Sequence, residues 1–231
     1  MFIIASISYA ISIFIDVFSY HLKVNLHDNK NVRYLLSMIN IFQYSARAFV
    51  LIYVPFMAYY TETIRDKDIV WQITLLSHIF VIILLIPLFS GIFSKVLSIK
   101  IFNILNIFFG KSIKTEFNRP FEDKNHSTAT NDISILEKFK FIFLTYIAGF
   151  LFSFSITFLY YLSFSYSQKA LTLSSYSQIL NMVGSLILVL LIDPKFMILV
   201  DKGRGFTEVK LLTMSRILVH ITLVILLFIL K

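Results

Sequence analysis

Six long apolar stretches dominate this sequence, and each is long enough to cross a lipid bilayer as one helix. A transmembrane helix needs about 20 mostly apolar residues, because the hydrocarbon core is about 30 Å thick. The stretches cover about residues 2–18, 32–59, 69–93, 139–162, 171–199 and 209–230. We therefore expect an all-α integral membrane protein, with residues 1–231 forming a single domain built as a bundle of about six transmembrane helices.

The composition excludes an ordinary water-soluble domain. Hydrophobic residues make up 58% of the 231 residues and charged residues only 15%, whereas soluble domains average about 45–50% and about 25%. Lipid must therefore cover much of the apolar surface. The net charge of +8 is then carried mainly by the loops between the spans. We therefore expect membrane lipids, not nucleic acid, as partners.

The stretch between the third and fourth spans, residues 94–138, contains the main polar region. Its first part, residues 94–110, is apolar but interrupted by Lys95 and Lys100. Flanking lysines on an apolar segment are typical of a helix that lies in the membrane interface. We therefore expect an interfacial helix here, followed by a polar loop over residues 111–132.

The distribution of Lys and Arg over the loops predicts the orientation of the chain. The segments after the odd-numbered spans contain 16 of these residues, and those on the other side contain 4. Cytoplasmic loops carry the excess of positive charge in multi-pass proteins. The odd loops, including residues 94–138, are therefore predicted to be cytoplasmic, with both termini outside.

Arg47 is the polar residue that most needs an explanation. It lies 15 residues after Val32, about 22 Å along a helix, and so near the middle of the bilayer. An Arg at this depth costs roughly 2.5–3.5 kcal/mol on insertion scales. We expect it to bind an anionic head group, since its planar donors suit phosphate. The alternative is a structural ion pair with Asp16 or Asp193.

Other polar residues fall into two layers of the predicted bundle. His78, Asn181 and His220 lie at mid-membrane depth, where they are candidate substrate ligands or, equally, structural groups that bond a neighbouring helix. A second layer lies nearer the cytoplasmic side and consists of Asp16, Asp193 and Lys195, with Asp201 following near the membrane surface.

The chain has no recognisable enzyme signature. It contains no cysteine, no His-Glu-x-x-His motif, no nucleophile-elbow sequence and no phosphate-binding loop. We therefore expect a protein that is not an enzyme and that needs no cofactor or metal.

Three segments resemble the Amj family, the alternate lipid II flippases of bacteria. The segment NMVGSLILVLLIDPKFMILVDKG has that family's apolar run closing on an Asp-Pro pair, with a further Asp several residues later; these are Asp193, Pro194 and Asp201. The segment YSARAFVLIYVP resembles a Ser-Arg-containing run followed by Pro, with Ser45 and Arg47 at the matching positions. The third is SYAISIFIDVFSYHLKVNL.

The resemblance implies a function in cell-wall biogenesis. Such a protein would flip lipid II, the lipid-linked peptidoglycan precursor, across the bacterial cytoplasmic membrane, as a monomer or homo-oligomer. Arg47 would offset the phosphate charge, while Ser45, Asn181 and the two histidines would complete the substrate site. The gate or ion-coupling groups near the cytoplasmic mouth would be Asp16, Asp193, Lys195 and Asp201. The alternatives are a flippase for another polyprenyl-pyrophosphate-linked glycan and the substrate-capturing membrane subunit of a small-molecule transporter.

The predicted orientation can be tested by labelling single cysteines, because the chain has none of its own. A cysteine at position 124 should react only after the membrane is permeabilised, and one at position 231 should react in intact cells. Labelling of position 124 from outside would overturn the orientation.

Overall fold

The computed structural model describes residues 2–25, 32–109, 135–201 and 205–231, and within this part of the chain all regular elements are helical. Seven of the helices are long and apolar enough to cross a membrane. The structure therefore confirms the all-α, multi-pass membrane class. The polar loop predicted over residues 111–132 lies outside the described residues.

The main helices agree closely with the predicted spans. They are α1 (Phe2–Val24), α2 (Val32–Ala58), α3 (Lys67–Leu85), α4 (Gly91–Phe109), α5 (Ile135–Ser165), α6 (Ala170–Ile187), α7 (Asp193–Asp201) and α8 (Phe206–Ile229). Four short helical turns extend or join them: η1 (Tyr59–Ile64), η2 (Ile86–Phe89), η3 (Ser167–Lys169) and η4 (Leu188–Ile192). The fifth predicted span is thus α6, η4 and α7 taken together, with Pro194 at the start of α7.

Local signals set the ends of the second and third spans. The π-helical turn η1 extends α2 and closes at Arg65, whose left-handed backbone (φ 57°) lets its N–H donate to the Tyr60 carbonyl. Asp66 then caps α3, because its carboxylate accepts the Ile69 N–H at 3.0 Å. This cap starts α3 at Lys67, slightly before the predicted start.

Pro87 ends the third span earlier than the sequence predicted. The predicted span continued to Phe93. Instead, α3 gives way to the 3-10 turn η2, and Ser90 is extended (φ −75°, ψ 114°) before α4 begins. Proline has no N–H for the helical ladder and its ring clashes with the preceding turn. The chain therefore changes direction here.

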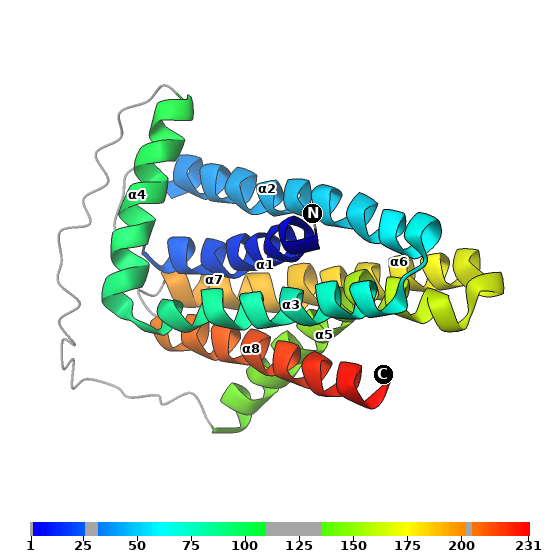
Figure 1. Ribbon diagram of the computed structural model, residues 1–231. Coiled ribbons are helices and arrows are strands. Elements are labelled where there is room, and N and C mark those ends of the chain that lie inside the picture. The colour runs from blue at the N-terminus through cyan, green and yellow to red at the C-terminus, as the bar shows by residue number, and fades with distance from the viewer. Residues whose placement is uncertain (1, 26–31, 110–134, 202–204) are drawn as a thin grey trace.

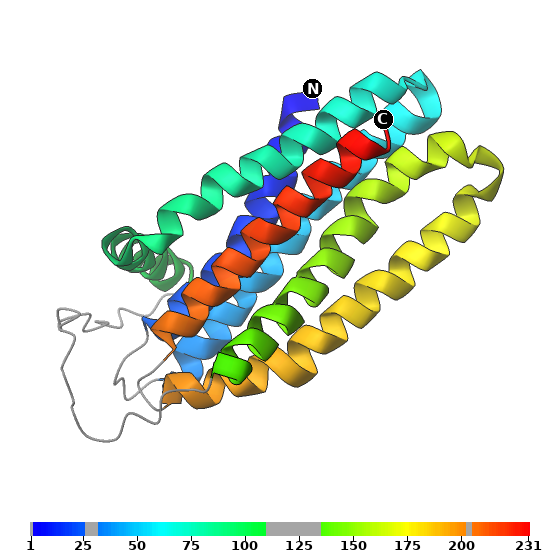
Figure 2. The ribbon, with the colours of Figure 1, turned by 90° about the horizontal axis from the view of Figure 1, so that it is seen from below.

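Helix α1 lies at the centre of the bundle. It packs against α2, α3 and α8, and Figures 1 and 2 show these helices lying alongside it. Its fully buried Ala5, Ser6 and Ala10 are small, which allows neighbouring backbones to approach closely. The Ser6 hydroxyl donates to the Ile73 carbonyl of α3 at 3.0 Å.

Helices α2 and α6 lie at the two sides of the bundle. The main contacts of α2 are with α1, and those of α6 are with α5, which in turn packs on α8. Both outer helices expose large apolar side chains, among them Leu51 at 72% and Leu171 at 87%. Lipid is the solvent that suits these surfaces.

Helix α4 runs across one end of the bundle, whereas the other long helices run lengthwise (Figure 1). Two hydrogen bonds fix α4 to the end of α1. His21 Nδ1 in α1 lies 3.0 Å from Ser94 Oγ in α4, and Asn25, the residue after α1, donates through Nδ2 to Ser98 Oγ at 2.8 Å. Its other face is apolar, with Ile92 and Ile107 each 80% exposed. This crosswise course is the one expected of an interfacial helix.

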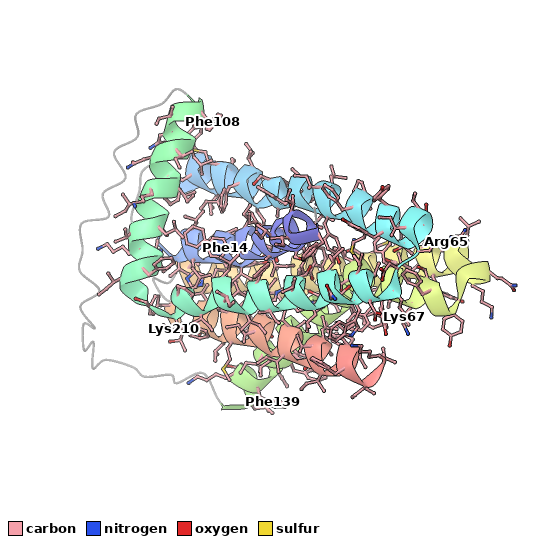
Figure 3. The ribbon with its side chains drawn as sticks, in the orientation of Figure 1. Phe14, Arg65, Lys67, Phe108, Phe139 and Lys210 are labelled. Carbon is pink, nitrogen blue, oxygen red and sulfur yellow. The ribbon has the colours of Figure 1, made fainter. Side chains whose placement is uncertain are left out.

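The charges at the two ends of the bundle can be followed in Figure 3. Arg65 and Lys67 lie at the end opposite α4, in the connection between α2 and α3, while Lys210 lies at the α4 end. The α4 end is the one for which the loop charges predict a cytoplasmic location.

We predict that α4 lies at one depth in the membrane and does not cross it. Spin labels on cysteines introduced at Ile92 and Ile107 should be equally shallow, and a label at Ile83 in α3 should be deep. The first two positions are 15 residues apart, about 22 Å along the helix. Power-saturation measurements in proteoliposomes would report depths differing by nearly that length if α4 spanned the bilayer.

Candidate functional site

A polar cleft of about 290 Å³ opens in the side of the bundle between α2 and the η4 region. Its walls come from α1, α2, α5 and the α6–η4–α7 span. The polar residues that line it are Ser12, Asp16, Tyr20, Asn40, Gln43, Tyr44, Arg47, Ser185 and Asp193. Two carboxylates and a guanidinium in one intramembrane cleft make it the strongest candidate for a functional site.

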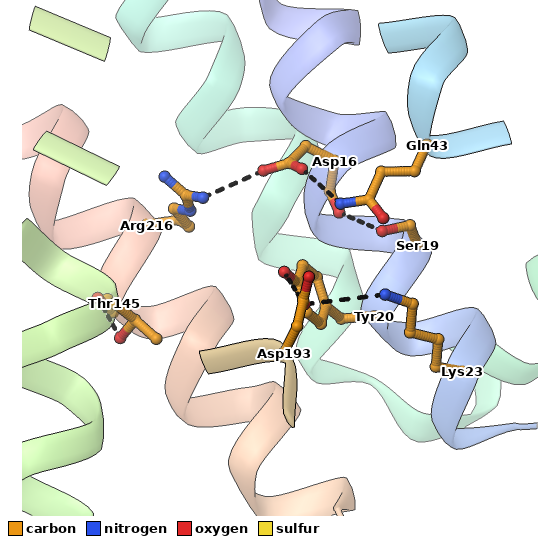
Figure 4. Close-up of polar contacts among 9 residues, drawn as sticks. Asp16, Ser19, Tyr20, Lys23, Gln43, Thr145, Asp193 and Arg216 are labelled. Carbon is orange, nitrogen blue, oxygen red and sulfur yellow. Dashed lines mark hydrogen bonds and ion pairs between the residues drawn. The ribbon is translucent and has the colours of Figure 1, made fainter. Parts of the chain in front are cut away.

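Asp16 sits at the inner wall of this cleft and is held from two sides (Figure 4). Arg216 of α8 donates through Nη2 to Asp16 Oδ2 at 3.1 Å, and Gln43 of α2 donates through Nε2 to Asp16 Oδ1 at 3.0 Å. The carboxylate therefore joins three helices, α1, α2 and α8. The predicted alternative partner for Asp16 was Arg47, so the ion pair exists but involves a different arginine.

Arg216 is the one arginine that is buried among the described residues. The sequence prediction counted it among the cytoplasmic loop charges, and this was wrong. It lies within α8, its side chain is 1% exposed, and its Nε and Nη1 atoms have no hydrogen-bond partner among the described residues. The signal that could have revealed it is its spacing, four residues before His220, which places both on one face of a helix.

Gly149 of α5 makes room for this arginine. A Cβ atom built on Gly149 would lie 2.4 Å from Nη1 of Arg216 and 3.0 Å from its Cδ. Such contacts are too close for any side chain, so the absence of a side chain at this point allows the guanidinium to enter the bundle. The fold thus provides a specific space for a charge that is expensive to bury.

Asp193 forms a second anchored carboxylate at the cleft. The Tyr20 hydroxyl donates to Asp193 Oδ1 at 2.6 Å, and Lys23 Nζ lies 3.9 Å from the same oxygen (Figure 4). The Lys23 side chain is 6% exposed, so this pair lies largely within the protein. Sequence reasoning placed Lys23 in a loop, but α1 continues past the predicted end to Val24.

Arg47 lines the mouth of the cleft with its side chain exposed. Its guanidinium lies 5.2 Å from the centre of the Tyr44 ring, on the same helix, where a cation–π contact offsets part of its charge. No carboxylate of the described residues lies within ion-pair distance of it. Arg47 is therefore a cation facing an accessible space, unlike Arg216 and Lys23.

The charged groups that line the cleft, taken together with the cations paired with its carboxylates, carry one more positive than negative charge. Arg216 and Lys23 balance Asp16 and Asp193, which leaves Arg47 in excess. Side-chain amides and hydroxyls complete the lining, and these groups can hydrogen-bond phosphate or sugar. An anion with a polar, hydroxyl-rich head group therefore matches the cleft chemically.

The two histidines predicted to face a substrate lie elsewhere. His78 and His220 are both fully buried, and their Nδ1 atoms are 2.9 Å apart. Neither lines the cleft. The sequence correctly placed them at one depth, but their pairing across α3 and α8 could not be read from periodicity.

The remaining predicted site residues do not line the cleft either. Ser45 donates its hydroxyl to the Phe42 carbonyl of its own helix at 2.6 Å. Asn181 lies on α6 one turn before the cleft residue Ser185, and its Oδ1 is buried. Lys195 is exposed. Asp201 is the last residue of α7, and its side chain lies outside the described part of the structure.

His21 is a further polar contact point that the sequence did not single out. Its Nδ1 lies 3.0 Å from Ser94 Oγ of α4, and its Nε2 lies 3.0 Å from Thr213 Oγ1 of α8. The ring thus fastens three helices together at the α4 end of the bundle. Within the described ranges, no group of three or more His, Asp or Glu side chains is arranged to hold a metal ion.

Comparison of the chain with protein-family models, with curated protein sequences and with solved structures finds no match.

We predict that the two partners of the Asp16–Arg216 pair differ in their tolerance of mutation. Asp16→Asn leaves a guanidinium that is 1% exposed without a counter-ion, and should lower the unfolding free energy by about 3–5 kcal/mol. Arg216→Met should cost less, because the Asp16 side chain is 20% exposed at the cleft.

The double variant Asp16→Asn/Arg216→Met should recover most of the loss. Unfolding by SDS titration in mild detergent, monitored by circular dichroism, measures all three variants. Strictly additive losses would contradict a direct interaction between the two residues.

Proposed function

We propose that this protein moves the anionic head group of a lipid-linked precursor across the membrane through the polar cleft. The observation that carries this proposal is Arg47, an exposed guanidinium at the mouth of the cleft with no carboxylate partner among the described residues. The multi-pass helical architecture supplies the setting, since a membrane-spanning bundle is the fold in which such transport takes place.

The depth of Arg47 is the main support for a head-group site. It lies in the middle of α2, about 22 Å from the start of that helix. A guanidinium exposed to hydrocarbon at this depth would be strongly unfavourable. Contact with water or with an anionic ligand in the cleft removes this cost. A phosphate is the ligand that uses the planar donors of arginine best.

The other lining groups suit the rest of a polyprenyl-pyrophosphate-linked head group. Asn40, Gln43 and Ser185 carry amide and hydroxyl groups that can bond to sugar oxygens. The carboxylates of Asp16 and Asp193 are already neutralised by Arg216 and Lys23. They therefore repel a pyrophosphate less than free carboxylates would.

The side opening of the cleft suits a substrate with a long lipid tail. The rim between α2 and η4 is apolar, with Val50, Leu188 and Val189 among the lining residues. Apolar side chains such as Leu51 and Leu190 are exposed on the adjoining helix surfaces, at 72% and 64%. A polyprenyl chain could remain in lipid beside these helices while its head group occupies the cleft.

Lipid II is the specific substrate that we propose, and the reason is the resemblance to the Amj family at Arg47, Asp193 and Pro194. Two of these residues, Arg47 and Asp193, line the cleft. The protein would then act in the bacterial cytoplasmic membrane, as a monomer or homo-oligomer, in cell-wall biogenesis. Another polyprenyl-pyrophosphate-linked glycan would present the same phosphate chemistry to Arg47.

We predict that Arg47→Ala inserts normally into the membrane but fails to rescue a strain depleted of its lipid II flippase. Arg47→Lys should also fail, because lysine offers a point charge in place of a two-pronged donor. Surface accessibility of lipid II after induction of each variant is the measurement, with protein level checked in isolated membranes.

Arg33→Ala is the matched control, since Arg33 lies on the same helix, is exposed and does not line the cleft. It should rescue as the wild type does. Full rescue by Arg47→Ala would overturn the proposed role of the cleft. Copurification of the protein with an ATPase module would instead favour the substrate-capturing subunit of a transporter.

A further inference from the structure

The buried pair of His78 and His220 lies at the meeting point of α1, α3, α5 and α8. The two imidazole rings approach through their Nδ1 atoms, 2.9 Å apart, with ring centres separated by 5.1 Å. The Tyr9 ring from α1 meets both histidines edge-on, at 5.9 Å and 6.2 Å between centres. All three side chains are completely buried.

The hydrogen bonds of the pair determine where its protons lie. Thr157 Oγ1 donates to the Ser153 carbonyl at 2.8 Å, so it can only accept from His78 Nε2, which lies 3.4 Å away. His78 therefore carries its proton on Nε2 and accepts at Nδ1. It follows that His220 carries its proton on Nδ1 and donates it to His78.

This arrangement leaves one bare nitrogen lone pair inside the bundle. His220 Nε2 has no hydrogen-bond partner among the described residues. The hydroxyls of Tyr9 and Ser153 lie near each other, and neither has a further hydrogen-bond partner among the described residues. A basic nitrogen that is fully buried and unpaired is rare in proteins, because each such group costs free energy.

A line of polar groups connects this nitrogen with the cleft. Arg216 lies one turn before His220 on the same face of α8, with Nε and Nη1 unpaired in the described structure. Arg216 Nη2 in turn holds Asp16, which borders the cleft (Figure 4). Arg216 thus neighbours His220 on one face of α8 and is bonded to the cleft carboxylate Asp16, and this ion pair is the link between the histidine pair and the cleft.

We propose that the His78–His220 pair is a proton-binding site that couples proton movement to head-group movement through the cleft. The proton-binding site stands independently of the proposed function, whereas its coupling to head-group movement rests on that function. The proton binds at Nε2 of His220, the nitrogen that has no hydrogen-bond partner in the described part of the chain. The pair then holds one positive charge, spread over two imidazoles that share the Nδ1 proton.

The added charge changes the balance at the cleft. The extra charge lies near Arg216, one turn away on α8, and Arg216 holds Asp16 at the cleft. The electrostatic potential at the cleft therefore becomes more positive, and a phosphate head group binds more strongly. Loss of the proton reverses this change and releases the head group. Proton and anion therefore bind together, which is the condition for movement in the same direction.

The groups that face the pair come from every helix packed around it. They are Tyr9 from α1, Tyr53 beyond it from α2, Ser153 and Thr157 from α5, and Arg216 from α8. Arg216 is the charged member of this set, and it opposes protonation of the pair. Asp16 forms an ion pair with Arg216, which reduces the net positive charge near the pair.

The site itself is tested without any substrate. Protein labelled with ¹⁵N-histidine in proteoliposomes, studied by solid-state NMR between pH 5 and 8, should show two coupled imidazoles that gain one proton together. Their signals should be assigned by their loss in His78→Gln and His220→Gln, whose amides can keep one hydrogen bond of the pair. Signals of the pair that do not change with pH would overturn the proposal.

The coupling is tested with a pH gradient across the same vesicles. For one proton per head group, the distribution of lipid II between the leaflets should shift about tenfold per pH unit. His220→Gln and His78→Gln should still move lipid II but show no such shift. The control is His21→Gln, a buried histidine bonded at both ring nitrogens, which should respond as the wild type does.

The outcomes separate the two proposals. Lipid II movement that ignores the gradient in the wild type overturns the coupling and leaves the proposed function standing. A pair that titrates in a protein that moves no lipid II supports the proton site and overturns the proposed function. Gradient-dependent movement that persists in both histidine variants overturns the assignment to this pair.

Discussion

The ion pair between Asp16 and Arg216 is the interaction on which the rest of the interior depends. It joins the central helix α1 to α8, and Gln43 extends the same contact to α2. Arg216 is almost completely buried, in a space that Gly149 leaves open. Without Asp16, this guanidinium would have no counter-ion inside the bundle, which is among the most destabilising situations in a folded protein.

This pair also separates two polar regions with different properties. On one side lies the open cleft, with Arg47 at its mouth and Asp193 held by Tyr20 and Lys23. On the other side lies the sealed histidine pair, which is fully buried and does not line the cleft. The open region can bind a ligand and the sealed region can hold a proton. Asp16 and Arg216 are the groups through which a charge in one is felt in the other.

Much of the architecture could be predicted from the sequence, because lipid imposes strict rules on a chain. Every backbone polar group must be paired within the spanning segment, so apolar stretches such as residues 171–199 had to be helical. The lysines in residues 94–110 indicated a separate helix, and α4 lies crosswise there. Helix ends were less predictable, since the Asp66 cap and the turn at Pro87 depend on local geometry.

The candidate site could be predicted only in part. Position along a helix follows from counting residues, and the sequence correctly placed Arg47 within α2, Asp16 within α1 and Asp193 in the fifth predicted span. The sequence by itself thus determined the helical class and the approximate extent of the long helices. The tertiary structure alone decided the partners: Asp16 meets Arg216 and not Arg47, and His78 meets His220. The reason is physical, because depth depends on position along one helix, whereas contact depends on the rotation and neighbours of several helices.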